Sequence, residues 1–269
     1  MNDCRPLPAT RLALAMLVLA LAACTPRAGV STTARATDPP RADGRTVLRA
    51  MHERYGGKWY MSLTFKQNVV IIGQTGRETK QVWNEYITLP GRLRIDYLPL
   101  ASKGGVLYAD GKMYGFAGGK QSAVQQGWHP LLSLMGDVYT QLPDTTALQL
   151  DSIGFDLGIA RKDKWEGKEA WVVGAVAGDS TTSQFWVDVD SLLVRRIVQR
   201  DTRSLKPVVT DTRFLSYRNL GGFPVAFSLR SYRDGRLYFK QDYFNAKVGE
   251  TLPVELFEPR TWATSQLKR

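Results

Sequence analysis

The feature that most constrains this chain is an alternation of apolar and polar residues that begins near Trp59 and recurs almost to the C-terminus. In KWYMSLTFKQ (58–67), one face collects Trp59, Met61, Leu63 and Phe65. Because successive side chains of a β-strand point to opposite faces, the pattern predicts a strand with one apolar face. The predicted strands cover residues 59–73, 79–89, 92–98, 104–109, 112–117, 154–162, 168–177, 183–189, 193–201, 209–217, 224–233 and 236–248.

Turn residues separate these strands. Asp-Gly pairs stand at 110–111 and 234–235, and such pairs favour two-residue hairpins. Consecutive antiparallel strands in this number avoid exposed edges by curling. We therefore expect a mainly β, α+β fold in which a strongly curved antiparallel sheet forms an open or half β-barrel capped by helices.

Two segments have the period of a helix instead. The first begins at Arg45, ends at Gly56-Gly57, and carries apolar residues on one face at Val47, Leu48, Met51 and Tyr55. The second, within residues 127–143, predicts one or two short helices. Either could lie against the open mouth of the barrel or fill its concave side.

The N-terminus has the order of a secretory signal. Arg5 and Arg11 precede an apolar segment, 12–23, that is shorter than the ~20 residues of a membrane span. Leu21-Ala22-Ala23-Cys24 resembles the lipobox of bacterial lipoproteins, which implies cleavage before Cys24 and acylation of its thiol. An ordinary signal peptide or an uncut anchor is the alternative. We expect a signal peptide at 1–23, an acylated N-terminus and disordered tether at 24–44, and a single domain at 45–269.

Cysteine content and charge exclude some functions. After the apolar segment Cys24 is the only cysteine, so a mature chain has no disulfide, thiol nucleophile or thiolate metal site. The net charge of +11 favours anionic surfaces such as phospholipid headgroups. A solvated basic surface is the alternative, and export makes nucleic acid the least expected partner.

The residues of an enzyme are not apparent. His52 and His129, the two histidines, lack metal-type partners at short spacing, and no G-x-S-x-G elbow occurs. Asp188 and Asp190 lack the spacing of a calcium loop and indicate a turn. We therefore expect no catalysis, no metal and no cofactor.

The order of motifs is more informative. A helix ending in YGGKW (55–59) precedes LPGRLRID (89–96), LYADGKMYGF (107–116), the helical insert, SQFWVDVDSLLVRRI (183–197) and FPVAFSLRSYRDGR (223–236). This order, over residues 45–250, resembles the LolA/LolB-like family of outer-membrane lipoprotein carriers. The resemblance implies a curved sheet around an apolar cavity that binds acyl chains. LolB-like members are themselves lipoproteins of the outer membrane.

The apolar strand faces would line such a cavity. We expect the lining to include Trp59, Met61, Leu63, Phe65, Tyr86, Leu93, Ile95, Phe155, Leu157, Phe185, Val187, Val225, Phe227 and Leu229. We expect the insert to form a lid with Trp128, Leu131, Leu132, Leu134, Met135 and Val138. The same residue types would also fill a closed interior, so both interpretations stay open. A register error of one residue would invert the inward face.

Two arginines share a strand face with an aspartate. Arg92, Arg94 and Asp96 alternate with apolar residues. A cross-strand salt bridge is the simpler interpretation. A contact of Arg92 or Arg94 with a lipid headgroup phosphate is the second.

These observations predict a membrane-anchored lipoprotein that faces the periplasm, binds acyl chains of a lipid or lipoprotein, and carries or accepts them in outer-membrane biogenesis. Its partners would be the membrane, through Cys24, and a periplasmic carrier or envelope protein. Thr25, by resemblance to Gram-negative lipoproteins, favours the outer membrane over the inner one. The alternative is a non-enzymatic scaffold or interaction module of the same fold, with a filled core and a protein partner.

Overall fold

The alternating segments form one sheet of 13 antiparallel strands in the computed structural model, which describes residues 42–202 and 206–267. The strands are β1 (Ser62–Ile72), β2 (Glu78–Thr88), β3 (Arg92–Tyr97), β4 (Gly105–Ala109), β5 (Lys112–Ala117), β6 (Lys120–Gln126), β7 (Ala160–Trp165), β8 (Lys168–Val173), β9 (Gln184–Asp188), β10 (Val194–Asp201), β11 (Val208–Leu220), β12 (Phe223–Arg233) and β13 (Arg236–Val248).

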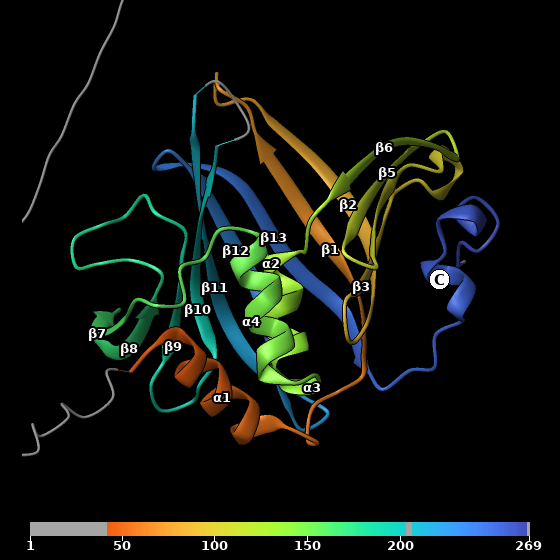
Figure 1. Ribbon diagram of the computed structural model, residues 1–269. Helices are drawn as coiled ribbons and strands as arrows, with labels where there is room; N and C mark the ends of the chain where they lie inside the picture. The colour runs from red at the N-terminus through yellow and green to blue at the C-terminus, as the bar shows by residue number, and fades with distance from the viewer. Residues whose placement is uncertain (1–41, 203–205, 268–269) are drawn as a thin grey trace, which may run out of the picture. The chain divides into compact units, whose positions relative to one another are not determined.

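The middle of the sheet pairs the first strand with the last. β1 lies against β13 from Leu63↔Val248 to Ile71↔Phe239. The remaining strands follow in order to β6 on one side and to β7 on the other (Figure 1). β6 and β7 are the two ends of this order, so the sheet is curved but unclosed. The predicted open half-barrel is confirmed.

Both predicted Asp-Gly hairpins are present. Asp110 and Gly111 have φ of 51° and 70° between β4 and β5, and Asp234 and Gly235 have φ of 47° and 79° between β12 and β13. Positive φ at both central residues is the requirement of the hairpin turn whose twist matches that of its strands.

Helical segments cover the concave face of the sheet (Figure 1). α1 (Gly44–Tyr55) begins at the N-cap Asp43, whose side chain accepts a hydrogen bond from the Thr46 N–H at 2.8 Å. The insert contains α2 (Pro130–Leu132), a π-helical turn η2 (Ser133–Asp137), α3 (Val138–Thr140) and α4 (Pro143–Ser152). The main apolar core lies between these helices and the sheet.

One strand of the sheet was not predicted, and one predicted strand is mostly wrong. β6 was not expected, because all seven of its residues are exposed and no apolar alternation marks it. The segment predicted as a strand at 154–162 is mostly a connection, in which Phe155 and Leu157 are buried against the main core. β7 begins only at Ala160. Apolar content in this segment therefore reflects loop packing rather than a strand face.

The C-terminal segment covers part of the convex face. Short 3₁₀ turns, η3 (Val254–Phe257) and η4 (Pro259–Thr261), pack a second apolar core against β3 and β4, and a further turn, η1 (Leu100–Ser102), follows β3. Trp262 stacks on Phe116 with ring centroids 4.2 Å apart. The sheet is thus buried on both faces near β3, and no periodicity in residues 249–269 predicts this covering segment.

The predicted signal peptide, Cys24 and most of the tether lie outside the described residues. Arg41–Arg269 form one compact unit. Within the described ranges, no helix is long and apolar enough to cross a membrane.

Candidate functional site

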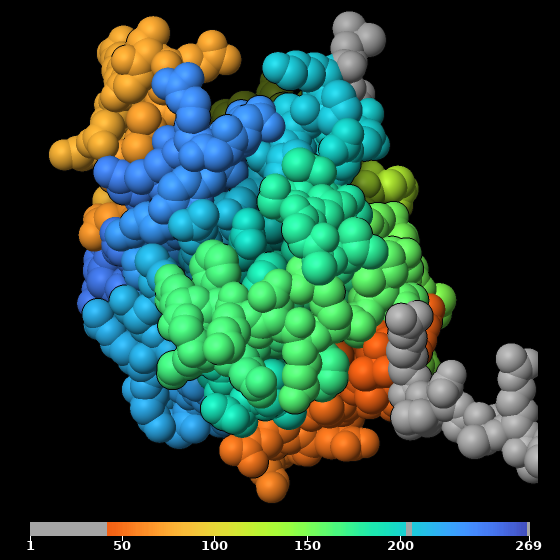
Figure 2. Space-filling model, turned by 90° about the vertical axis from the view of Figure 1, so that its left-hand side faces the viewer, coloured from red at the N-terminus to blue at the C-terminus, as the bar shows by residue number. Residues whose placement is uncertain are grey.

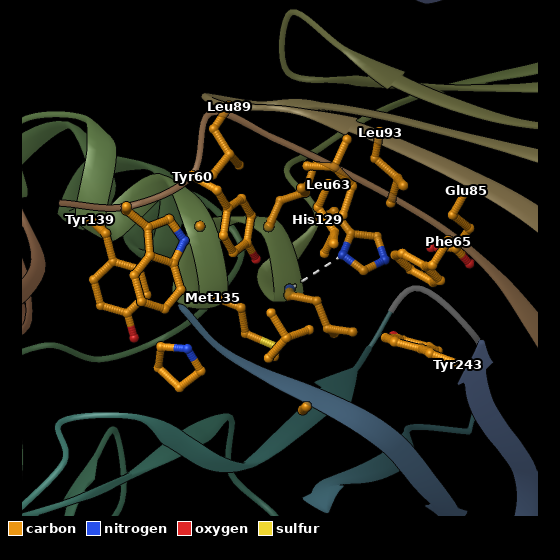
Figure 3. Close-up of a pocket in the computed structure, with 18 of the residues that line it drawn as sticks. Tyr60, Leu63, Phe65, Glu85, Leu89, Leu93, His129, Met135, Tyr139 and Tyr243 are labelled. Atoms are coloured by element: carbon orange, nitrogen blue, oxygen red, sulfur yellow. Dashed lines mark hydrogen bonds between the residues drawn. The ribbon is translucent and has the colours of Figure 1, made fainter. Parts of the chain in front are cut away.

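A chamber of about 90 Å³ lies between the concave face and the helical insert (Figure 3). It is lined by Trp59, Tyr60, Leu63, Phe65, Glu85, Ile87, Leu89, Leu93, Ile95, His129, Leu131, Leu132, Met135, Gly136, Tyr139, Leu193, Tyr217, Pro224, Val225, Ala226, Gln241 and Tyr243. Most of these side chains are apolar, as in many small-molecule sites.

Central strands supply the wall of the chamber. Leu63 and Phe65 on β1 and Leu93 and Ile95 on β3 reach it because residues two apart share a strand face. Val225 on β12 contributes from the other half of the sheet. The chamber therefore depends on strands from both halves of the half-barrel.

The insert forms the cover of the chamber, and Gly136 lets it lie close to the sheet. A Cβ on Gly136 would stand 2.5 Å from Leu89 Cδ2, and no real Cβ contact is that short. Gly136 lies in the π-helical turn, a rare conformation that is frequent at functional sites. Glycine is therefore needed for this close approach.

A buried carboxylate fastens the cover to the sheet. Asp137 is fully buried, and its Oδ1 accepts a hydrogen bond from the Gly91 N–H at 2.8 Å. Its Oδ2 has no hydrogen-bond partner among the described residues. Burial raises the pKa of Asp137 to about 6, and the bond from Gly91 opposes this rise.

Aromatic rings close one end of the chamber (Figure 3). Trp59 and Tyr139 have ring centroids 4.1 Å apart, and the Tyr139 hydroxyl donates to the Leu192 carbonyl at 3.3 Å. His52 on α1 places Nδ1 3.0 Å from the Val138 carbonyl. The α3 end of the cover is thus tied both to α1 and to the β9–β10 turn.

The opposite end carries a polar group. Glu85, Phe65, His129 and Tyr243 gather there (Figure 3). Glu85 is only 5% exposed, and its Oε1 accepts a hydrogen bond from Gln67 Nε2. Burial raises the pKa of Glu85 to about 8, against the opposing effect of that bond. The carboxyl is therefore mostly protonated at neutral pH.

A second cavity, which we call the vestibule, measures about 360 Å³ and shares Ile95, His129, Leu131 and Gln241 with the chamber. We call these four residues the neck. Figure 2 shows a notch at this end of the molecule, between the tip of the β1–β2 hairpin and the ends of β10 and β11. The vestibule is lined by Trp83, Ile95, Tyr108, Met113, Gln125, Gln126, Gly127, Trp128, His129, Pro130, Leu131, Gln199, Thr210, Thr212, Ser231, Tyr238, Phe239 and Gln241.

His129 has a structural role at the neck. Its Nδ1 accepts a hydrogen bond from the Leu131 N–H at 3.2 Å, which caps α2, and its ring meets Tyr108 edge-on at 4.7 Å. Burial lowers the pKa of His129 to about 4, so the ring is neutral at neutral pH and can keep this acceptor role.

The predicted lining residues fall into three groups. The chamber wall contains Trp59, Leu63, Phe65, Leu93, Ile95 and Val225. Phe155, Leu157, Phe185, Val187 and Leu229 are buried in the main core outside the lining, and Phe227 packs beside it. Met61 and Tyr86 require correction. Met61 precedes β1 and is 53% exposed, and Tyr86 lies in the convex-side core with Trp262.

The predicted lid residues also divide. Leu131, Leu132 and Met135 face the chamber, whereas Leu134 and Val138 are fully buried in the main core. Trp128 lies in the vestibule, where a Cβ on Gly111 would be 3.1 Å from its ring. Because the insert has a π-helical turn, its inward face departs from simple helical spacing.

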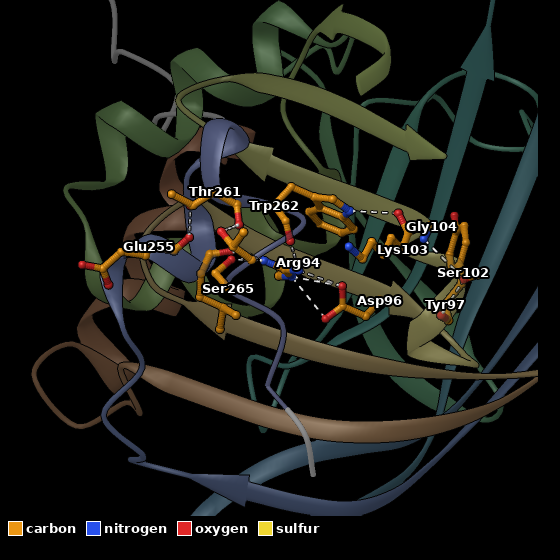
Figure 4. Close-up of polar contacts among 12 residues, drawn as sticks. Arg94, Asp96, Tyr97, Ser102, Lys103, Gly104, Glu255, Thr261, Trp262 and Ser265 are labelled. Atoms are coloured by element: carbon orange, nitrogen blue, oxygen red, sulfur yellow. Dashed lines mark hydrogen bonds and ion pairs between the residues drawn. The ribbon is translucent and has the colours of Figure 1, made fainter. Parts of the chain in front are cut away.

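Arg94 cannot contact a headgroup. It is fully buried beneath the C-terminal segment (Figure 4), where it pairs with Asp96 at 3.0 Å and lies 4.0 Å from the Trp262 ring centroid. It also donates to the carbonyls of Leu256 and Trp262 at 3.0 and 2.9 Å. A salt bridge with Asp96 was expected across strands, but it forms within β3. Arg92, on the same convex strand face, is half-buried and lies away from the chamber.

Sequence reasoning missed the polar and tyrosine residues of the chamber. The apolar alternation does not predict Glu85, because a carboxylate on an inward strand face departs from it. Tyr217 and Tyr243 lie on β11 and β13 at positions that were not assigned inward. The one sequence signal for these two residues was that each tyrosine lies next to the apolar residues of its strand.

Among residues 42–202 and 206–267, no group of three or more His, Cys, Asp or Glu side chains is placed to hold a metal ion.

Comparison with known proteins places the chain by fold. No family model matches the sequence, and no curated protein matches it. A DUF1329 family protein from Desulfovibrio piger has a TM-score of 0.53 at 15% identity, over 80% of this chain and 95% of that one. A protein domain described as outer membrane lipoprotein-sorting, from Vibrio parahaemolyticus, has a TM-score of 0.54 at 9% identity, over 82% and 98%. A LolA superfamily protein from Nitrosomonas europaea has a TM-score of 0.51 at 11% identity, over 81% and 98%. The chain therefore shares its fold with LolA-superfamily structures.

Proposed function

We propose that this protein is a lipid-anchored lipoprotein of the cell envelope that binds acyl chains in its chamber and carries or accepts them in outer-membrane biogenesis. It acts by non-covalent binding and not as an enzyme. The observation that carries the proposal is the apolar chamber beneath a separate helical cover, in a half-barrel of the LolA-superfamily fold.

The size of the chamber implies that the cover moves. Its volume of about 90 Å³ is below the ~150 Å³ of an engineered apolar cavity that accepts benzene. An acyl chain is much larger than benzene and enters only if the insert shifts away from the sheet. The proposed binding therefore includes a movement of the insert away from the sheet.

The energies allow reversible loading. Burial of two chains of about 14 methylenes each would supply roughly 20 kcal/mol before costs, at about 0.8 kcal/mol per methylene. Opening the cover and ordering the chains offset much of this gain. A carrier needs such a balance because it must also release its cargo.

Acylation of Cys24 would hold the domain at a membrane. One acyl chain alone binds only marginally, whereas two or three on one residue anchor stably. The tether predicted at 24–44 would then link the domain to the acylated N-terminus. An outer-membrane position facing the periplasm is the location we propose.

Native mass spectrometry of the full chain carrying Cys24→Ser tests the proposal, since this variant lacks acyl chains of its own. We expect co-purified lipid, or a lipid adduct after incubation with phospholipid or lipopeptide. Leu63→Arg should abolish the adduct because it places a charge in the chamber. Met61→Arg is the matched control, since Met61 is exposed two residues away. A bare polypeptide mass under all conditions would refute acyl-chain binding.

A second candidate function is favoured by the same small volume. If the cover stays closed, the interior is filled and the protein is a scaffold that binds a partner protein. The absence of any adduct to a folded Cys24→Ser protein would support this alternative.

A further inference from the structure

A chain of three hydrogen-bonded polar side chains runs from Glu85 in the chamber lining, through the buried Gln67, to Gln241 of the neck. Gln241 Nε2 donates to Gln67 Oε1 at 3.0 Å, and Gln67 Nε2 donates in turn to Glu85 Oε1. Gln67 is fully buried, and Glu85 is nearly so. Gln241 lines both cavities. The three side chains therefore link the chamber to the vestibule.

Part of the Glu85 carboxyl remains available to a ligand. Gln67 is its one hydrogen-bond partner among the described residues, and it engages Oε1. Glu85 belongs to the chamber lining between the apolar side chains of Phe65 and Ile95, which pair with it from β1 and β3. A carboxyl that is protonated at neutral pH offers a hydrogen-bond donor there.

The vestibule beyond the neck is polar but uncharged. Its polar lining consists of amides and hydroxyls together with the neutral His129, for example Gln199, Thr210 and Ser231. No Asp, Glu, Lys or Arg is among its described lining residues. Such a surface can satisfy hydroxyls, esters and amides, but it offers no counter-ion to a charged headgroup.

We propose that the chamber takes the chain of an amphiphile whose polar part is uncharged, and that Glu85 and Gln241 hydrogen-bond the ester, amide or hydroxyl at the junction. This inference rests on the proposed function and adds the chemical class of the ligand. The chain lies in the chamber, the junction lies at the neck, and the neutral polar group lies in the vestibule. A free carboxylate at the neck is disfavoured because burial there leaves it without a cation.

The test compares three probes with the same twelve-carbon chain, by calorimetric titration of the full chain carrying Cys24→Ser at pH 7. The probes are 1-monolauroylglycerol, with an ester, N-lauroylglycinamide, with an amide, and laurate, with a carboxylate. We expect at least one neutral probe to bind about tenfold or more tightly than laurate, which is the effect of one buried hydrogen bond left unmade. The tighter of the ester and the amide identifies the junction.

Three variants assign that preference to Glu85. Glu85→Leu removes the donor and should lower neutral-probe affinity about tenfold, bringing it close to that of laurate. Glu85→Gln keeps a donor and should keep the preference. Glu78→Gln, at the exposed start of the same strand and outside both cavities, is the control and should change neither affinity by more than a few fold.

The outcomes separate the two proposals. If all three probes bind equally, or if Glu85→Leu keeps the preference for neutral probes, the inference is wrong while chain binding stands. If neither these probes nor phospholipid binds, the proposed function fails and the inference falls with it. A preference that is present in the wild type and in Glu85→Gln but absent in Glu85→Leu supports the inference.

Discussion

Glu85 should make the folded state less stable as the pH rises, and Glu85→Gln should remove this dependence. The ordinary pKa of the carboxyl is 4.5, and burial raises it to about 8 in the folded protein. Between these values the folded chain holds a proton that the unfolded chain has lost. The free energy of unfolding therefore falls with rising pH, by up to about 1.4 kcal/mol per pH unit.

The magnitude follows from the two pKa values. Between pH 5 and pH 8 the loss from Glu85 alone amounts to about 3 kcal/mol. The glutamine side chain is nearly isosteric and can still accept from Gln67, but it does not titrate. The difference in unfolding free energy between Glu85→Gln and the wild type should therefore grow by about 3 kcal/mol over this range.

Urea denaturation followed by tryptophan fluorescence measures this difference, with the slope of each transition checked for constancy. Other buried groups titrate in or near the same range, notably Asp137 and His129. They are common to both proteins and cancel in the difference. Glu78→Gln, at the exposed start of the same strand, is the control and should shift stability by no more than about 0.5 kcal/mol. Parallel pH profiles for the wild type and Glu85→Gln would refute the burial argument.

Three further predictions concern the cover and the convex face. Arg94→Ala leaves the buried Asp96 without its cation and should cost about 3–5 kcal/mol in urea denaturation. Arg92→Ala, on the same strand face, is the control, and an equal loss in both variants would contradict the argument. Gly136→Ala forces a Cβ against Leu89 and should lower the free energy of unfolding by about 1–3 kcal/mol. Amide hydrogen exchange in the insert should become faster, and unchanged exchange there would argue against close packing of the cover on the sheet. Asp137→Asn keeps an acceptor for Gly91 but removes a carboxyl whose pKa burial raises from 3.8 to about 6. Because the raised pKa lowers the free energy of unfolding as the pH rises, the variant should gain up to about 3 kcal/mol relative to wild type between pH 3.8 and 7. A constant difference in unfolding free energy over this pH range would show that Asp137 titrates normally.

The strands were predictable because alternation in this chain is regular wherever one strand face is buried. β1 shows this, with Leu63, Phe65, Val69 and Ile71 on one face, and the Asp-Gly pairs supplied two of the turns. β6 was not predictable, since its residues are exposed on both faces. The C-terminal segment buries its apolar residues through 3₁₀ turns too short to show a period.

The chamber was predictable only where it obeys that alternation. Leu63, Phe65, Leu93 and Ile95 do so. On β2 the rule fails, because inward Glu85 is polar and outward Tyr86 is apolar. The C-terminal segment packs on the convex face of β2, so Tyr86 is buried there. No pattern in the sequence predicts that this segment packs on the sheet. Departures from local rules often mark sites whose function outweighs their cost in stability.

The pairing of β1 with β13 determines when a binding site can exist at all. Leu63 and Val248 lie side by side in the sheet yet about 185 residues apart in the sequence, and contacts of such separation form late in folding. Walls from β1 to β3 on one side and from β11 to β13 on the other therefore meet only once nearly the whole chain is available. A chain still emerging N-terminus first has no chamber, and it cannot take up a ligand before its own synthesis is complete.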